Sequence, residues 1–416
     1  MTPAAPRIAT LDAVRGLAVM GILLLNIVDF AMPGYAYVDP TYYGGATGAN
    51  IWVWRIVYLL FDGKMRGLFT MLFGASTWLI ADRAAAAGQN PWRVHYARMA
   101  TLLLFGLAHA YLIWSGDILV SYACCGAIVF VARRWRASAL WYAAVLLLVF
   151  RLATGVIDYG AARTFEAAAA APGASPALRA EWRTFADRLV PPTADIPRDL
   201  AAYRGSYADA LPVRAKDAWA SETIADVQAI PDMLALMLIG MALFQNGFFS
   251  GTWSRRAYRR IALAGFAISV PLYVPIARWI ESTHFSPITL TLTEAVHLTL
   301  LRPFVSLAWA SLVILVVRSA AWPRSTARLA AVGRAAFSNY LGTSILCGLL
   351  FDGFGLGWYG HLERWQCYPI VLAIWVLMLL WSKPWLDRFA YGPFEWLWRS
   401  LARLRWAPFR RKPIAT

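Results

Sequence analysis

A histidine and an aspartate lie close together at a turn between two apolar segments. His109 precedes Asp117 in the run GLAHAYLIWSGDILVSY. An imidazole can take and give a proton near neutral pH and a carboxylate can orient it, so the pair has the composition of a general acid–base site. In the alternative interpretation, His109 is a neutral residue hydrogen-bonded between helices, and Asp117 caps the second helix.

The first apolar segment carries a stripe of polar side chains. At 100° per residue, four of them fall within an arc of about 100°: Asp12, Arg15, Asn26 and Asp29. Arg15 and Asn26 are three turns apart, or about 16 Å, so the stripe extends across much of a membrane-spanning helix. Because a charge in the bilayer centre costs roughly a few kcal/mol, the stripe is expected to face the protein interior. The alternative is a structural ion pair between Asp12 and Arg15 near the membrane surface.

Other polar residues are candidates for substrate contact. Two cations lie between glycines in the run DGKMRGLFTMLFG, where they could attract an anion or bind a lipid headgroup. A tyrosine follows the His–Asp turn, and an asparagine lies in the later run GRAAFSNY. The predicted substrate-binding residues are therefore Lys64, Arg66, Tyr122 and Asn339. The four cysteines show no metal-type spacing, so no metal site is predicted.

The composition indicates the kind of elements that position these residues. Of 416 residues, 60% are hydrophobic and 15% are charged, and the mean hydropathy is +0.52. Soluble domains have about 45–50% apolar and about 25% charged residues, so a water-soluble enzyme is excluded. The 39 basic residues occur in short clusters between apolar runs, which is typical of membrane topology signals rather than of nucleic-acid binding.

The sequence predicts an all-α, polytopic membrane protein with about ten transmembrane helices. A span needs roughly 20 mostly apolar residues, and the candidate runs lie near 11–31, 65–82, 98–115, 118–133, 137–157, 231–250, 260–279, 297–318, 334–351 and 365–382. The run 51–61 is too short to cross alone and is expected to be a half-helix that leads into the second span. Arginines occupy every second loop, whereas the facing short loops contain no Lys or Arg. The predicted topology therefore places both termini in the cytoplasm.

One long connection divides the chain. Residues 1–157 are expected to form a membrane half with five spans and the catalytic residues, and residues 230–416 a second half with five spans and a basic amphipathic tail. Residues 158–229 are predicted to form a helical extracytoplasmic cap, with a disordered tether as the alternative.

Five motifs resemble a known family. In chain order they are RIATLDAVRG, KMRGLFTMLFG, His109 with GDIL, GRAAFSNY and GPFEWLWR. Together they are similar to the YeiB-like membrane protein family, which carries domain of unknown function 418. More remotely, the first span with its Leu-Asp12-x-x-Arg15-Gly run resembles the transmembrane acyltransferases that include the lysosomal heparan-α-glucosaminide N-acetyltransferase.

The remote resemblance implies an acyltransferase that uses acyl-CoA, acetyl-CoA in the first instance, from the cytoplasm. The acceptor would be an extracytoplasmic glycan, lipid or small molecule. His109, Asp117 and Asn26 are then the catalytic candidates, while Arg15 and Asp12 would contact the acyl-CoA. The lysosomal enzyme has its catalytic histidine between its first spans, but this chain has no histidine before His95. His109 is therefore assigned by its position and chemistry.

Two other classes of function remain open from the sequence. One is a transporter or exporter with a polar intramembrane path, and the other is a non-enzymatic membrane protein. The expected location is the bacterial inner membrane. The expected partners are the lipid bilayer, the acyl-CoA and the acceptor, with a homodimer left open and no nucleic acid.

Overall fold

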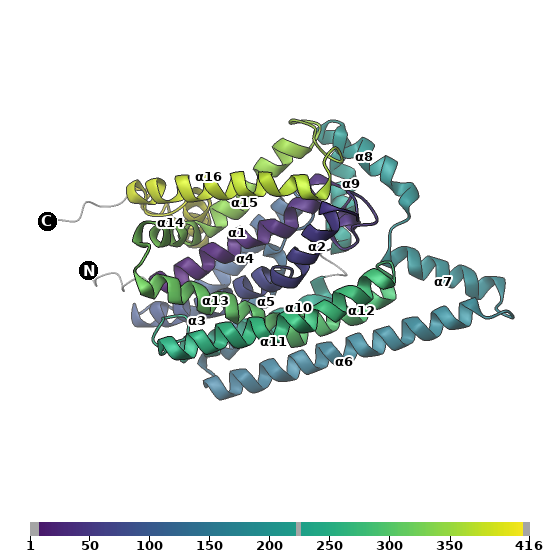
Figure 1. The fold of residues 1–416 in the computed structure, drawn as a ribbon. Coiled ribbons are helices and arrows are strands. Elements are labelled where there is room, and N and C mark those ends of the chain that lie inside the picture. Colours follow the sequence, from purple (N-terminus) through teal and green to yellow (C-terminus); the bar gives the residue numbers. More distant parts are fainter. Residues whose placement is uncertain (1–7, 222–225, 411–416) are drawn as a thin grey trace.

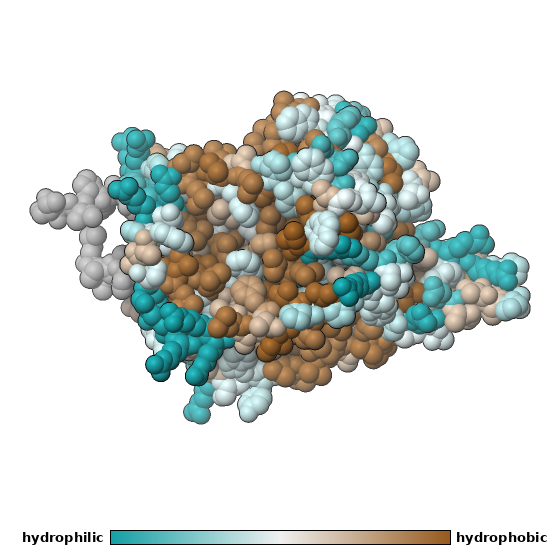
Figure 2. All heavy atoms as spheres, viewed as in Figure 1, coloured by the Kyte–Doolittle hydropathy of each residue, from teal (hydrophilic) through white to brown (hydrophobic). Residues whose placement is uncertain are grey.

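The computed structural model describes residues 8–221 and 226–410, and these residues form helices without any β-strand (Figure 1). Five segments are long and apolar enough to cross a membrane: Ala9–Ala31, Ala137–Ala170, Arg255–Ser282, Pro287–Ser319 and Arg364–Arg388. Two shorter apolar helices cover Ala229–Gln245 and Ala336–Phe351. The surface in Figure 2 shows a broad apolar band between polar ends, which is the pattern of a protein embedded in a bilayer.

The helices follow one another in an order that reflects the apolar runs. The helices of the first half are α1 (Ala9–Ala31), α2 (Ala49–Leu60), α3 (Lys64–Ala86), α4 (Pro91–Leu112), α5 (Leu119–Val129) and α6 (Ala137–Ala170). The cap helices are α7 (Pro176–Leu189), α8 (Ile196–Arg204) and α9 (Tyr207–Ala220). The helices of the second half are α10 (Asp226–Gln245), α11 (Arg255–Ser282), α12 (Pro287–Val296), α13 (Arg302–Ser319), α14 (Pro323–Arg334), α15 (Ala336–Phe351), α16 (Cys367–Arg388) and α17 (Pro393–Arg403).

Helix α1 forms the centre of the bundle. Most of its residues are buried, and it lies between α3, α14, α15 and α16 (Figure 1). Two glycines allow the closest of these approaches, because a Cβ at Gly16 would lie 2.1 Å from the Leu329 carbonyl oxygen and a Cβ at Gly333 would lie 1.9 Å from that of Asp12. Small residues permit such backbone contacts in membrane bundles. In contrast, the long α6 lies at the edge of the bundle with most of its side chains exposed.

Two apolar segments are interrupted. The predicted half-helix is α2, and it joins α3 through a short turn in which Gly63 has φ +65°, a left-handed conformation that favours glycine. The second interruption is a π-helical stretch, His297–Leu301, between α12 and α13. Both interruptions lie at the same level, because Ser306 Oγ donates to the Lys64 carbonyl at 2.8 Å and Trp309 Nε1 donates to the Leu60 carbonyl at 2.9 Å.

The described part of the long connection is helical. Helix α6 continues to Ala170, and α7 covers the predicted Pro176–Leu189. Helices α8 and α9 cover one end of the bundle, where Arg214 pairs with Asp352 at 2.8 Å and Gly353 N donates to the Tyr203 carbonyl at 2.8 Å.

Candidate functional site

The His109–Asp117 pair is formed at the turn between α4 and α5. His109 lies in the last turn of α4, and Asp117 lies just before α5. The distance from His109 Nδ1 to Asp117 Oδ2 is 2.6 Å, and both side chains are 0% exposed. The second carboxylate oxygen, Oδ1, accepts the Val120 backbone N–H at 2.9 Å. Asp117 therefore caps α5 and orients the imidazole at the same time, so the two interpretations of the sequence describe one arrangement.

This geometry defines what the imidazole can do. A carboxylate only accepts hydrogen bonds, so Nδ1 carries the hydrogen and Nε2 carries the lone pair when His109 is neutral. Within the described residues, Nε2 of His109 is buried without a hydrogen-bond partner. Buried polar atoms are usually paired, because an unpaired one costs about 1–3 kcal/mol. His109 is thus an oriented base with its accepting atom unused.

Two aromatic rings connect His109 with the hollows of this region. The Tyr340 ring centroid lies 5.2 Å from that of His109, and the Trp114 centroid lies 6.0 Å away. Tyr340 and Asn26 line a small hollow whose other walls are apolar side chains of α1, Thr343 and Ser344 of α15, and Met378 of α16. Trp114 lines a larger hollow of about 480 Å³ beneath α8 and α9. His109 therefore lies behind rings that border both spaces.

The polar stripe of α1 is divided between two environments. Asn26 lines the smaller hollow, and Asp29 accepts a hydrogen bond from Trp114 Nε1 at 2.7 Å. Arg15 lies three turns away from Asn26, where it contacts Asp12 at 3.3 Å and Ser76 Oγ at 2.8 Å. The structure thus brings Asn26 near His109 through Tyr340, and it leaves Asp12 and Arg15 at the other end of α1.

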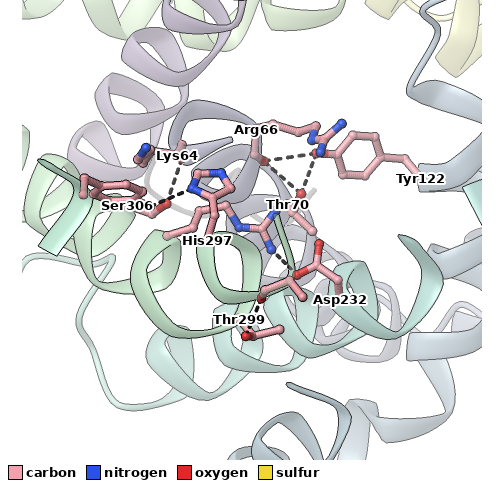
Figure 3. Close-up of polar contacts among 11 residues, drawn as sticks. Lys64, Arg66, Thr70, Tyr122, Asp232, His297, Thr299 and Ser306 are labelled. Carbon is pink, nitrogen blue, oxygen red and sulfur yellow. Dashed lines mark hydrogen bonds and ion pairs between the residues drawn. The ribbon is translucent and has the colours of Figure 1, made fainter. Parts of the chain in front are cut away.

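Lys64 lies in a different cluster, at the interrupted helices (Figure 3). Its side chain is 0% exposed, its ammonium donates to the Tyr58 carbonyl, and its Nζ lies 3.8 Å from the centre of the Tyr273 ring. The Tyr273 hydroxyl hydrogen-bonds with His297 Nδ1 at 2.8 Å. Arg302 forms a buried ion pair with Asp232 nearby. Lys64 is therefore held by protein groups and is not adjacent to the His109 site.

The other three predicted substrate-binding residues have different surroundings. Arg66 is exposed, in contrast to Lys64 on the same helix. The Tyr122 hydroxyl hydrogen-bonds with Thr70 Oγ1 at 2.7 Å. Asn339 is buried; its amide nitrogen donates to the Val332 carbonyl and to Ser382, and its oxygen accepts from Trp381. Neighbouring Ser338 hydrogen-bonds with Glu395 instead, so the side chains of this run point in different directions.

Sequence reasoning did not identify the Asp232–Arg302 pair or the Tyr273–His297 hydrogen bond. Asp232 and Arg302 are each a single charge inside an otherwise apolar run, and that isolation is the signal that could have indicated them. Their pairing could not be predicted, because the residues are 70 positions apart.

The larger hollow is acidic. Asp29, Asp199, Asp217 and Asp352 line it together with Arg214. Burial raises the pKa of Asp217 to about 6, and the nearby Asp199 carboxylate adds to this shift. Burial also raises the pKa of Asp352 to about 6, while the neighbouring Arg214 opposes the shift. These two carboxyl groups can therefore take up protons slightly below neutral pH.

Comparison with known proteins gives the family. The model of the family described as "Protein of unknown function (DUF418)" matches residues 243–405. The chain is 30% identical to "Uncharacterized protein YeiB" of Escherichia coli (strain K12), over 95% of this chain and 96% of that protein. It is 27% identical to "Uncharacterized protein YxaH" of Bacillus subtilis (strain 168), over 98% of this chain and 96% of that protein. No solved structure matches. With motifs, composition and end-to-end similarity in agreement, the chain belongs to the YeiB-like DUF418 family of membrane proteins.

Proposed function

We propose that this protein is a membrane acyltransferase in which His109 is the general base. The observation that supports the proposal is the buried His109–Asp117 pair with its unused Nε2. A base of this kind needs a fixed tautomer and a free lone pair, and the carboxylate at 2.6 Å provides the first.

The reaction would be a direct transfer from an acyl thioester to a hydroxyl or amine. His109 Nε2 takes the acceptor proton while the acceptor oxygen or nitrogen forms a bond to the acyl carbon. The carbon–sulfur bond then breaks, and the protonated His109 returns the proton to the leaving thiolate. Asp117 would stabilise the imidazolium between these steps, and Asn26 on α1 would donate a hydrogen bond to the developing oxyanion.

The donor would bind from the opposite end of α1. Arg15 and Asp12 lie near the start of α1, and the Arg15 guanidinium suits phosphate groups of acetyl-CoA or a longer acyl-CoA. The acceptor would enter from the cap side, where the larger hollow borders Trp114.

This direction of transfer requires the predicted topology of ten spans in a bacterial inner membrane. Several contacts are consistent with it, because segments expected on the same side meet. Arg255 donates to the Arg318 carbonyl at 2.8 Å, joining two loops expected in the cytoplasm. Asn50 donates to Glu363 at 3.1 Å, joining two loops expected outside. Reporter fusions at Asn50, within 158–229 and at Gly355 should all report the outside, and an inside signal at any of them would contradict the topology.

Acyl transfer can be tested with labelled acetyl-CoA and membranes from cells with and without the protein. Label should appear in a lipid, glycan or small molecule only when the protein is present, and His109→Ala should lower the rate by about 10²–10⁴ while acetyl-CoA still binds. His95→Ala is a matched control, because His95 is also buried on α4 but hydrogen-bonds with the Gly126 carbonyl at 2.9 Å. Near-normal transfer by a folded His109→Ala protein would exclude the general-base role, and failure to bind any acyl-CoA would exclude the enzyme.

A further inference from the structure

Arg66 lies one turn beyond an unusual junction in the membrane bundle. The turn between α2 and α3 faces the π-helical stretch between α12 and α13: a Cβ at Gly63 would lie 2.5 Å from His297 Nε2 and 3.2 Å from Arg302 Cδ. Interrupted helices and π-helical turns both recur at binding sites in membrane proteins. Side chains at this junction that lack a protein partner are therefore candidates for ligand binding.

The most buried ionisable residues of the junction already have partners. The Lys64 ammonium contacts the Tyr58 carbonyl and the Tyr273 ring, and Arg302 pairs with Asp232. His297 hydrogen-bonds with Tyr273. These groups hold the two interruptions together and offer little to a ligand.

Arg66 differs from them because its backbone is fixed while its charged end is unused. Its carbonyl accepts Thr70 Oγ1 at 2.9 Å and the Tyr122 hydroxyl at 3.4 Å. In Figure 3 the Arg66 side chain extends towards Tyr122, away from Lys64 and His297. Its guanidinium forms no hydrogen bond or ion pair with any side chain of residues 8–221 and 229–410, and the residue is exposed.

The surroundings of Arg66 contain more basic than acidic side chains. Arg66 interacts electrostatically with charged residues around it, and these interact with further charged residues. Together the group comes from five helices and the α2–α3 turn. The cations are Lys64, Arg66, Arg151 and Arg302, and the carboxylates are Asp62, Asp232 and Glu294. With all of these groups charged, four cations face three carboxylates, so a single anionic group would balance the cluster.

We propose that Arg66 is a binding site for an anionic group, a carboxylate or a phosphate, of a ligand that enters the bundle. The planar guanidinium offers parallel N–H donors that match either group in a bidentate contact. Asp62 and Glu294 would oppose a doubly charged ligand, which favours one that carries a single negative charge. The site does not require acyl transfer, so it stands or fails separately from the proposed enzyme.

The test uses the purified full-length protein and two sources of the same chemistry. The first arm measures the melting temperature in detergent with inorganic phosphate or acetate, against sodium chloride at equal ionic strength. The second arm compares nanodiscs of phosphatidylcholine with nanodiscs that also contain phosphatidylglycerol. Each arm uses the wild type, Arg66→Gln and Arg66→Lys. The control is Arg83→Gln, an exposed arginine near the other end of α3.

Because the Arg66 guanidinium makes no hydrogen bond or ion pair within the part of the chain that the structure describes, Arg66→Gln should fold as the wild type does. We expect phosphate or acetate to raise the melting temperature of the wild type and of Arg83→Gln, but not that of Arg66→Gln, with a smaller rise for Arg66→Lys. A higher melting temperature that is seen only in phosphatidylglycerol nanodiscs, and is lost in Arg66→Gln, would assign the anion to a lipid headgroup. An equal response in Arg66→Gln, or no response of the wild type in either arm, would overturn the site.

Discussion

Two buried polar clusters of this protein, at the α4–α5 turn and at the interrupted helices, differ in which atoms they leave without a hydrogen bond. At the α4–α5 turn, Asp117 holds His109 and the imidazole keeps a free Nε2. At the interrupted helices, Lys64 and His297 are both engaged by Tyr58 and Tyr273. In the sequence, both clusters contain ionisable residues within apolar segments, so both are candidates for a functional site.

The comparison shows that burial of an ionisable residue does not by itself indicate chemistry. The cost of placing Lys64 in the interior is offset by fixed protein groups, which is the behaviour of a structural lock. An imidazole with one nitrogen oriented and the other unused has no such compensation. Arg302 Nε of the second cluster is also buried without a hydrogen-bond partner, but it is a donor of a permanently charged group. The unused acceptor of an oriented imidazole, rather than burial, marks the candidate active site.

Removal of the carboxylate that orients His109 should have the largest effect on activity. Asp117→Asn preserves the shape of the side chain but allows its amide to donate to Nδ1, which moves the hydrogen to Nε2 and removes the free lone pair. We expect acyl transfer to fall by about 10²–10⁴, as for His109→Ala, because both changes remove the base. The measurement is the single-turnover rate with saturating labelled acetyl-CoA, and an unchanged rate would break the assignment of the pair.

If the second cluster is structural, removing one of its charges should lower the free energy of unfolding without removing the general base. Arg302→Ala leaves Asp232 buried without its ion-pair partner, which should cost about 3–5 kcal/mol. Denaturant unfolding in detergent can measure this effect. Arg55→Ala is the control, because the Arg55–Glu281 pair is 34% and 22% exposed and its loss should cost at most about 1 kcal/mol. Equal effects of the two variants would contradict the structural lock.

The two ends of α1 are predicted to separate donor binding from proton transfer. Arg15→Ala should weaken acetyl-CoA binding by about tenfold, because it removes a charge-assisted contact to phosphate. Binding can be measured by calorimetry in detergent, with Arg198→Ala on the cap as the control. If Arg15→Ala leaves the dissociation constant unchanged, Arg15 belongs to the structural contacts with Asp12 and Ser76 alone.

The smallest expected effect concerns the cap. Because the pKa of Asp217 is about 6 in the folded protein, above the usual value near 3.9 for an aspartate, the folded state binds more protons than the unfolded state between about pH 4 and pH 6. Stability should therefore fall as pH rises through this range. Asp217 is exposed to solvent, which screens its charge, so Asp217→Asn should raise stability at pH 7 by less than about 1 kcal/mol. A melting-temperature series from pH 5 to 7 should be flatter for Asp217→Asn than for the wild type.

Much of the fold could be predicted from the sequence because its signals are local. Apolar length predicts the helices α1, α6 and α16, and the short apolar run 51–61 predicts the half-helix α2. His109 and Asp117 are only eight residues apart across a turn, so their contact could be predicted without knowledge of the bundle.

The properties that required the tertiary structure all depend on helices packed from distant parts of the chain. The sequence alone determined an all-helical membrane chain with a His–Asp pair and a polar stripe on its first helix, since these follow from composition and helical period. Only the packed bundle decided that Asp232 neutralises Arg302 and that Asn339 accepts a hydrogen bond from Trp381. It also decided that the Arg66 guanidinium makes no hydrogen bond or ion pair among the described side chains. The physical reason is that a buried charge is defined by its neighbours, and those neighbours are set by which helix faces meet in space.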